Sequence, residues 1–464
     1  MRFVQTFWTA GRNPLEHGFG WLRPEFNLMS WALSCLSLRE HYDEVALYTD
    51  EQGKHVLIDL LHLPYTEVNV VYDEKLCLPQ HWAYAKIKTY SLQTKPFLHV
   101  DGDVFLPKPI SEDVINATLM AQNKETGTEY YRRMMDGILQ EATLELPDYI
   151  GEALREAYIA SYNMGVFGGN DLAFIHAYCE EAQNLYESNK AFCSDGNFNL
   201  LFEQILFACK VKREHQSVCT IFPMLFNDNG YTVADFCQLC DYEHKGYFHI
   251  LGGHKRNQVI TESLAEALII HYPDYYRMIT TLYSGQYTRG VIGGAICVPL
   301  MTTDIPISSY IDFLNEAEED WCSISWEELY EIELRCIEGR AMSRYEEKLG
   351  SAPAVCLNPC LKCFDVPTTW GAESLQRMRE RFLCKPDAPI ERIAVIPTLS
   401  PKTRREYVLY GVEHQVLELL KKHPMQISEL VGTLTSKSEE MRTLWHTEIR
   451  ILLNEGLLIP FFIN

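Results

Sequence analysis

Hydrophobic and polar positions follow two alternating patterns over the first 110 residues. Short apolar runs, typical of buried strands, alternate with longer segments in which apolar residues recur every three to four positions, as in helices. The predicted strands are MRFVQTFW, VALYTD, TEVNVVY and PFLHVDGDV, and the predicted helices between them are NLMSWALSCLSLREH, KHVLIDLLHLP and HWAYAKIKTYSLQT. Strands that alternate with helices predict βαβ units, and therefore an α/β fold with a mainly parallel sheet.

The pattern changes after residue 125. Residues 125–160 are polar with helical spacing, which indicates an insertion or a lid. The Gly-rich segment ASYNMGVFGGND is strand-like, and DLAFIHAYCEEAQNLYES and NLLFEQILFACKVK are amphipathic helices. GYFHILGGHKRN follows, and then two helical pieces that are broken at Pro273.

The rest of the chain predicts two smaller parts. Residues 286–400 hold helical segments and the Pro/Cys-rich stretch APAVCLNPCLKCFDVP, and we interpret them as a linker or accessory region. Residues 401–464 hold the strand-like segment REYVLYG, three helices and a last strand, a pattern typical of a small winged-helix-like domain. We therefore expect three domains, at residues 1–285, 286–400 and 401–464.

Length, charge and cysteine content exclude several classes of protein. A chain of 464 residues has room for two or three domains, and its apolar runs are too short for a membrane span. The net charge of −22 disfavours general binding to nucleic acid, although a local basic cluster could bind one anionic small molecule. Fifteen scattered cysteines without a secretion signal favour reduced thiols and a cytoplasmic protein.

The stretch FLHVDGDVF places two carboxylates at the end of a predicted strand. Asp101 and Asp103 are separated by Gly102, so both can reach one cation. Hard divalent ions such as Mg²⁺ and Mn²⁺ prefer oxygen ligands and leave coordination sites open for a substrate diphosphate. In a chain with 63 acidic residues, the alternative is a solvated turn.

A second stretch, FHILGGHKRN, offers a complementary set of groups. His249, Gly252 and Lys255 form the pattern H-x-x-G-x-x-K. An imidazole can supply a further metal ligand, a glycine lets the backbone approach a phosphate, and a lysine supplies a positive charge. The alternatives are a buried or surface histidine with other hydrogen-bond partners and a simple Gly-Gly turn.

These stretches resemble the GT-A-fold glycosyltransferases, and most closely glycosyltransferase family 8, which includes the glycogenins and bacterial lipopolysaccharide galactosyltransferases. The resemblance covers residues 1–260 and rests on AYAKIKTYSL, DGDVF, YNMGVFGGN and HILGGHK in the family's order. It implies a Rossmann-like GT-A domain and a hexosyltransferase that uses Mn²⁺ or Mg²⁺ and a nucleotide sugar, a UDP-sugar by analogy, with retention of configuration.

The resemblance also implies site residues. Their expected roles are metal binding by Asp101, Asp103 and His249, diphosphate contacts by Gly252 and Lys255, and nucleotide or donor contacts by Lys86, Asn163, Phe7 and Thr9. A metal bound there would act as a Lewis acid on the leaving diphosphate, and Lys255 would stabilise its developing charge.

The sequence departs from the family on the acceptor side. The family's Asp-Gln pair is missing, and the nearest candidates for acceptor-side catalytic residues are Glu203, Gln204 and, upstream, Asp195. Glu203 could equally be the polar face of an amphipathic helix. The P-W ending that usually follows H-x-x-G-x-x-K is replaced by Arg256-Asn257. These departures leave open a non-catalytic protein that binds nucleotide sugars or peptides on a GT-A-like scaffold.

Two further features raise other possibilities. Cys356, Cys360 and Cys363 have the spacing of an iron–sulfur site, and with Cys384 they could bind structural zinc, although unligated thiols are the commonest outcome. The C-terminal segment resembles both a DNA-binding winged helix and a PqqD-like module that captures peptides. From residue 404 onward it has seven basic and eight acidic residues, which disfavours DNA and leaves a peptide acceptor, or a packing or dimerisation module, as alternatives.

Overall fold

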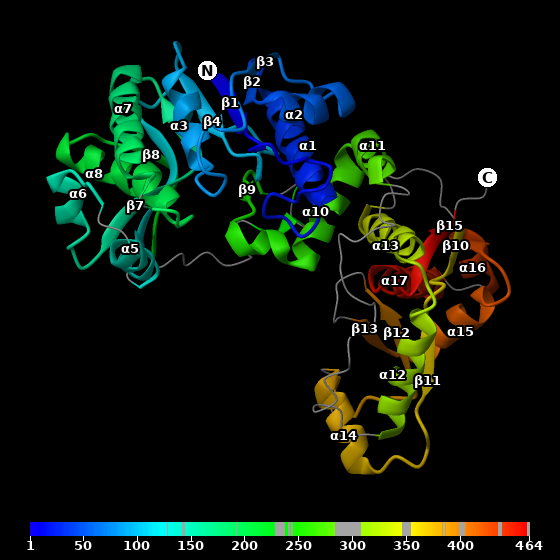
Figure 1. The fold of residues 1–464 in the computed structure, drawn as a ribbon. Coiled ribbons are helices and arrows are strands. Elements are labelled where there is room, and N and C mark those ends of the chain that lie inside the picture. Colours follow the sequence, from blue (N-terminus) through cyan, green and yellow to red (C-terminus); the bar gives the residue numbers. More distant parts are fainter. Residues whose placement is uncertain are drawn as a thin grey trace. The chain divides into compact units, whose positions relative to one another are not determined.

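In the computed structural model, the chain forms two compact units, residues 1–264 and 265–464 (Figure 1). We describe each unit by itself. The structure describes residues 1–127, 129–141, 144–191, 193–227, 237–239, 242, 245–283, 308–345, 354–382, 384–385, 387–398, 404–434 and 439–461.

The first unit is built on a seven-stranded sheet in the order β3-β2-β1-β4-β7-β6-β8. The strands are β1 (Arg2–Phe7), β2 (Val45–Thr49), β3 (Glu67–Val70), β4 (Phe97–Val100), β6 (Met120–Gly127), β7 (Ile159–Gly169) and β8 (Cys219–Asn227). Neighbouring strands are parallel except at the β4–β7 and β7–β6 pairs. The predicted α/β class with a mainly parallel sheet is therefore confirmed.

Helices cover both faces of this sheet (Figure 1). Side chains alternate along a strand, so Phe3 and Val4 of β1 point into different cores. The core that contains Val4 also holds buried residues of α3 (Ala83–Ser91), α7 (Leu172–Asn189) and α8 (Leu206–Arg213). The core that contains Phe3 holds Leu38 of α1 (Pro24–His41). The shorter helical segments are α2 (Glu51–Lys54), η1 (His55–Leu60), α4 (Glu112–Ile115), α5 (Tyr130–Glu141), α6 (Asp148–Ala153) and η2 (Leu200–Ile205).

One element of this unit contradicts the sequence interpretation. We expected residues from about 125 onward to be helical, yet β6 continues to Gly127 in the middle of the sheet. Its sequence, MAQNKETG, is polar at its end because cross-strand pairing with β7 and β8, rather than apolar periodicity, stabilises it. The helical prediction holds for α5 and α6.

The second unit contains two three-stranded sheets, in the orders β14-β10-β15 and β11-β12-β13. The strands are β10 (Ala354–Leu357), β11 (Lys362–Asp365), β12 (Arg392–Pro397), β13 (Arg404–Leu409), β14 (Met425–Gln426) and β15 (Leu458–Phe461). The helices are α11 (Pro273–Tyr283), α12 (Ser308–Trp321), α13 (Trp326–Tyr345), α14 (Ala372–Arg381), α15 (Gly411–Leu420), α16 (Ile427–Leu434) and α17 (Glu439–Asn454); α10 (Gln258–His271) spans the boundary between the units.

The C-terminal segment is part of this unit's core. The three helices and the last strand predicted from the sequence are present as α15, α16, α17 and β15. β15 pairs with β10, and the core joins residues of α15–α17 with Met342, Val355 and Ala394. Whether residues 286–400 and 401–464 act as separate functional domains, and whether the latter is a winged helix, stay predictions.

The four cysteines considered as metal ligands do not form a metal site. Cys356 lies on β10, Cys363 lies on β11, and Cys360 lies in the turn between them, while Cys384 follows α14. All four are free thiols. Among the described residues, the one group of three or more His, Cys, Asp or Glu side chains close enough to share a cation contains no cysteine. The iron–sulfur and zinc interpretations are therefore wrong for these thiols.

The described helices were also searched for membrane spans, and none is both long enough and apolar enough to cross a bilayer.

Glu413, in the first turn of α15, gives a pH-dependent contribution to the stability of the second unit. Its carboxylate accepts hydrogen bonds from Tyr410 N (2.7 Å) and Tyr407 Oη (2.8 Å). Burial nevertheless raises the pKa of Glu413 from 4.5 to about 7. Because the folded protein holds this proton more tightly than the unfolded chain, the contribution is complete below pH 4.5 and is lost as the pH rises to 7.

We therefore expect the free energy of opening α15 to fall between pH 4.5 and 7, and Glu413→Gln to remove part of that fall. Native-state hydrogen exchange of the α15 amides measures both. Identical pH slopes in the wild type and the variant would rule out this contribution of Glu413.

Candidate functional site

The Asp101–Asp103 turn lies at the carboxyl end of β4, beside the centre of the sheet, and hydrogen bonds to two neighbouring elements fix its backbone. Asp101 N donates to Gly165 O of β7 at 2.8 Å. On the other side, two serines of α1 donate to the turn: Ser30 Oγ to Gly102 O at 2.7 Å and Ser34 Oγ to Asp101 O at 3.3 Å.

The glycine between the two aspartates is required by packing. A Cβ at Gly102 would lie 2.5 Å from Cζ2 of Trp31, far inside normal contact distance. Trp31 is itself buried on α1, so it has little room to move. The turn can therefore lie against α1 only with glycine at its centre.

A short antiparallel pair brings His249 to the aspartates from almost 150 residues away. β5 (Val104–Phe105) follows the turn directly and pairs with β9 (Phe248–His249), with Val104 opposite His249. Ile250 N donates to Asp103 O at 3.0 Å and extends the pairing. Gly165 makes room for the imidazole, because a Cβ there would lie 2.5 Å from His249 Cε1.

Asp101, Asp103 and His249 together form a group that could hold a metal ion. One ligand atom from each lies within 4.8 Å of the other two. His249 Nδ1 lies 2.7 Å from Gln122 Oε1, an atom that can only accept a hydrogen bond, so Nδ1 carries a proton. In the neutral ring, Nε2 then presents a lone pair toward Asp103 Oδ1, 3.6 Å away. Two acceptors that face each other in this way fit a shared cation, and the orienting amide is typical of metal-bound histidine.

Burial sets the ionisation of these groups. It lowers the pKa of His249 to about 4 although Asp103 favours the charged ring, so the imidazole is neutral at pH 7. It raises the pKa of Asp101 to about 7 against the effect of Lys86. Burial also opposes the charge of Asp103, but Lys255 and His249 outweigh it and the pKa of Asp103 lies below its ordinary value. Because burial penalises the negative charge on these carboxylates, a bound divalent cation would be strongly favoured.

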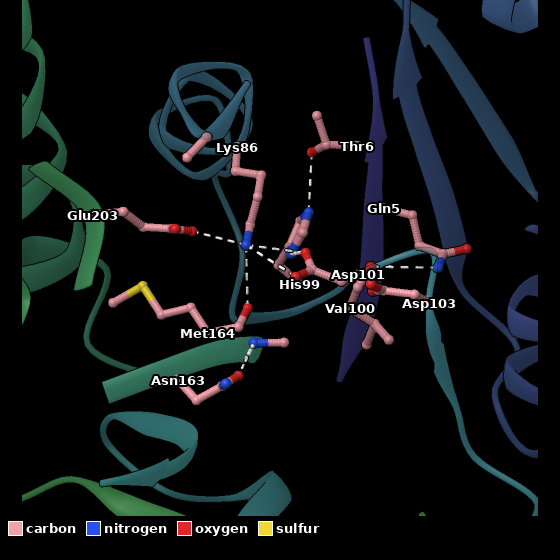
Figure 2. A network of polar contacts seen from close by, with 12 residues as sticks. Gln5, Thr6, Lys86, His99, Val100, Asp101, Asp103, Asn163, Met164 and Glu203 are labelled. Carbon is pink, nitrogen blue, oxygen red and sulfur yellow. Dashed lines mark hydrogen bonds and ion pairs between the residues drawn. The ribbon is translucent and has the colours of Figure 1, made fainter. Parts of the chain in front are cut away.

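Lys86 of α3 lies buried between two carboxylates (Figure 2). Its Nζ is 3.0 Å from Asp101 Oδ1 and 2.7 Å from Glu203 Oε1, and it donates to Met164 O at 3.3 Å. Burial disfavours the ammonium, but Asp101 and Glu203 outweigh this effect and raise its pKa. Lys86 therefore holds a fixed positive charge behind Asp101, on the side away from Asp103.

A cavity of about 610 Å³ opens beside the aspartates. Its wall includes Asp101, Asp103, Lys86 and Lys255, and Lys255 pairs with Asp103. Lys255 and Gly252 belong to the short 3₁₀ segment η4 (Gly252–Arg256), where Gly252 has φ of +40°, a conformation that glycine adopts readily. Aromatic side chains supply much of the remaining wall: Phe7, Trp8, Phe19, Trp21, Trp31 and Trp82.

The predicted site residues divide into two groups by their position. The residues that line the cavity are Phe7, Lys86, Asp101, Asp103, Gly252 and Lys255. His249 lies behind Asp103, and the others are absent from the described wall: Thr9, Asn163, Asp195, Glu203 and Gln204. Their roles in binding or catalysis stay predictions.

The residues outside the wall have structural partners. Thr9 N and Thr9 Oγ1 both donate to Asp50, at 2.7 and 2.8 Å. Asn163 Oδ1 accepts from Gly165 N at 3.0 Å, which braces the strand beneath His249. Asp195 accepts from Asn197 N at 2.7 Å within its own turn.

The acceptor-side candidates lie in η2, a π-helical segment. Glu203 is 1% exposed and pairs with Lys86. Gln204 Oε1 lies 3.5 Å from Tyr131 Oη.

Sequence reasoning missed several residues that shape the site. Gln122 lies on β6, the strand that the sequence analysis did not identify, so its contact with His249 could not be foreseen. Ser30 and Trp31 have helical spacing on α1, but nothing in that spacing indicates their contact with the turn. Arg12 and His17 line the cavity from the loop after β1, where the Gly/Pro-rich composition predicted no more than a loop.

Replacing Gln122 tests its role in orienting His249. Gln122→Met keeps the side-chain length but removes the acceptor for His249 Nδ1. We expect the affinity for Mn²⁺ to fall about 10- to 100-fold, the usual cost of losing such a partner. Calorimetric Mn²⁺ titration measures this, and circular dichroism checks the fold. Unchanged affinity in a folded variant would show that Gln122 does not orient a ligand.

Comparisons with known proteins identify a family but no activity. A family model described as a family of unknown function (DUF6734) matches residues 1–282. No curated protein matches the chain.

Two solved structures are similar over part of the fold. The glycosyltransferase GlyE of Streptococcus pneumoniae TIGR4 is 11% identical with a TM-score of 0.29, and the match covers 61% of this chain and 64% of that one. The inositol-1-phosphate CTP transferase from T. maritima is 14% identical with a TM-score of 0.28, and the match covers 58% of this chain and 96% of that one.

Proposed function

Since the chain belongs, through residues 1–282, to a family of unknown function (DUF6734), we propose its activity from the site itself: a divalent-metal-dependent glycosyltransferase with a nucleoside-diphosphate sugar as donor. The observation that carries this proposal is the Asp101–Asp103–His249 group at the edge of a cavity that also contains Lys255. Three stretches that resemble family 8, around Lys86, Asp103 and His249, come together there although they are far apart in the sequence.

The parts of the site have distinct roles in this proposal. A divalent ion, Mn²⁺ or Mg²⁺, would supply Lewis-acid stabilisation of the leaving diphosphate. Lys255 lies beside Asp103 on the cavity wall and would stabilise negative charge on the diphosphate as the bond to the sugar breaks. Lys86 holds Asp101 in place, and Gln122 keeps His249 Nε2 available. The aromatic wall would pack against the nucleotide and the sugar and exclude water.

Resemblance alone supports the finer points. They are a UDP-sugar donor, transfer of a hexose with retention of configuration, and a GT-A fold for the first unit. A peptide acceptor is supported by the pattern of residues 401–464 and by their lack of a basic excess. Because these residues share a core with the rest of the second unit, the acceptor is best tested on the full chain, with peptide and glycan panels rather than a truncation.

A non-catalytic protein that binds nucleotide sugars is the second candidate. The burial of Glu203 against Lys86, outside the cavity wall, favours it, because no acceptor-side carboxylate equivalent to the family's is then in reach of a substrate.

A donor panel separates the two candidates. With Mn²⁺ present, each UDP-sugar is scored for binding by calorimetry and for slow hydrolysis by release of UDP. The proposed enzyme releases UDP from at least one donor, and chelation of the metal stops the release. Tight binding without release from any donor would favour the non-catalytic protein, and release that continues in chelator would refute the metal-dependent proposal.

A further inference from the structure

The loop between β1 and α1 contributes a charged pair to the cavity wall that the proposed chemistry does not use. Arg12 and His17 both line the cavity. Arg12 Nε donates to Thr9 O at 3.2 Å, and its guanidinium lies 4.9 Å from the ring centre of Phe19. These contacts fix the direction of the guanidinium but do not compensate its charge.

The contacts of His17 determine which of its nitrogens carries the proton. Phe19 N donates to His17 Nδ1 at 3.0 Å, so Nδ1 is the acceptor and the neutral ring has its proton on Nε2. Burial, helped by the charge of Arg12, lowers the pKa of His17, which favours this neutral ring. Phe19 has φ of +45°, a costly conformation for a bulky residue, so the loop is built to hold this arrangement.

Two donors consequently face the same space. Arg12 Nη1 lies 3.3 Å from His17 Nε2, and each of these nitrogens carries hydrogen. They cannot satisfy each other. Moving the proton of His17 to Nδ1 would let Nε2 accept from Arg12, but it would set Nδ1–H against Phe19 N–H. The pair is satisfied when one external acceptor lies within reach of both donors.

The charge of Arg12 makes that acceptor an anion. The other two buried or half-buried cations of the wall have carboxylate partners: Lys86 has Asp101 and Glu203, and Lys255 has Asp103. Among the residues that the structure describes, no carboxylate pairs with Arg12, although the chain carries 63 acidic residues. Burial lowers the pKa of Arg12, which reflects the cost of a charge left without a counter-ion.

We propose that Arg12 and His17 form an oxyanion subsite of the cavity, which binds a phosphate or carboxylate group of the substrate. The guanidinium supplies the charge and one N–H donor, and His17 Nε2 supplies a second donor. As a feature of substrate binding, this subsite rests on the proposed function. The oxyanion has two possible sources with the same chemistry: the diphosphate of the donor, or an acidic group on the transferred sugar, as in a uronate.

The first experiment uses inorganic phosphate and metal-free protein, so it does not depend on the proposed activity. In protein labelled with ¹⁵N-histidine, we expect the unliganded His17 to be protonated at Nε2. Added phosphate should shift the His17 ring signals and raise the pKa of His17. Arg12→Gln should remove most of the response, and Arg133→Gln on α5, which changes an exposed arginine, should keep it. No response of His17 to phosphate, or an equal response in Arg12→Gln, would overturn the proposal.

The second experiment identifies the source of the oxyanion. Calorimetry with Mn²⁺ compares UDP, UDP-glucose and UDP-glucuronate in the wild type, Arg12→Gln and Arg133→Gln. A loss of about tenfold or more for all three ligands in Arg12→Gln places the diphosphate in the subsite, and a loss confined to UDP-glucuronate places the sugar acid there. Binding of all three ligands unchanged by Arg12→Gln would overturn the subsite. If no nucleotide binds the wild type, the proposed function fails, and the phosphate response of His17 still decides the subsite.

Discussion

Asp103→Asn should abolish metal-dependent release of UDP from a UDP-sugar, with a loss of about a thousandfold or more. The asparagine keeps the shape of the side chain but removes the charge that faces both His249 and Lys255. A metal ion supplies several kcal/mol of charge stabilisation in such sites, and each 1.4 kcal/mol corresponds to tenfold in rate. UDP release with saturating Mn²⁺ measures the effect.

The matched control for this experiment is Asp43→Asn, which changes an exposed aspartate after α1 and should retain full activity. Mn²⁺ titration of the same proteins shows whether the loss arises from the metal site. If Asp103→Asn keeps a tenth or more of wild-type activity, Asp103 is not a ligand on which the reaction depends.

Lys86→Met should destabilise the first unit by about 3–5 kcal/mol in metal-free protein. The change leaves Asp101 and Glu203 facing each other without a cation, and Glu203 is 1% exposed. Breaking a buried ion pair from one side is costly because the remaining charge stays buried. Urea unfolding, followed by circular dichroism, measures the change in the free energy of unfolding.

A second variant separates the ion pair from simple packing. Lys86→Met/Glu203→Leu removes both buried charges of that pair and should recover part of the lost stability. Exposed Lys75→Met is the matched control and should change stability little. A cost below 1 kcal/mol for Lys86→Met, or a double variant no more stable than the single one, would contradict the account of Lys86 as the cation that holds these carboxylates.

The parts of the fold that could be predicted from the sequence are those with strong local patterns. Apolar runs identified β1, β2 and β4, and the position of Asp101 and Asp103 at the end of a buried strand followed from β4 alone. The pattern around His249 is also local, and the structure brings it to the aspartates through the β5–β9 pair.

The rest depends on contacts between distant segments. β6 has no apolar periodicity over its second half, and its place in the sheet comes from pairing with β7 and β8. Gln122 was missed with it. Glu203 matches the amphipathic pattern of a helix, and nothing in that pattern shows that its carboxylate is buried against Lys86. The facing donors of Arg12 and His17 depend on the tautomer that the Phe19 amide selects, which no sequence pattern encodes.

The central claim is that Asp101, Asp103 and His249 hold a divalent ion that contacts the diphosphate of a nucleotide. Electron–nuclear double resonance of bound Mn²⁺, recorded with UDP, tests both halves of this claim in one measurement. We predict a ¹⁴N coupling from one imidazole, which is lost in His249→Asn, together with a ³¹P coupling from the diphosphate. Bound Mn²⁺ with neither coupling, or a ¹⁴N coupling that survives in His249→Asn, would contradict the account.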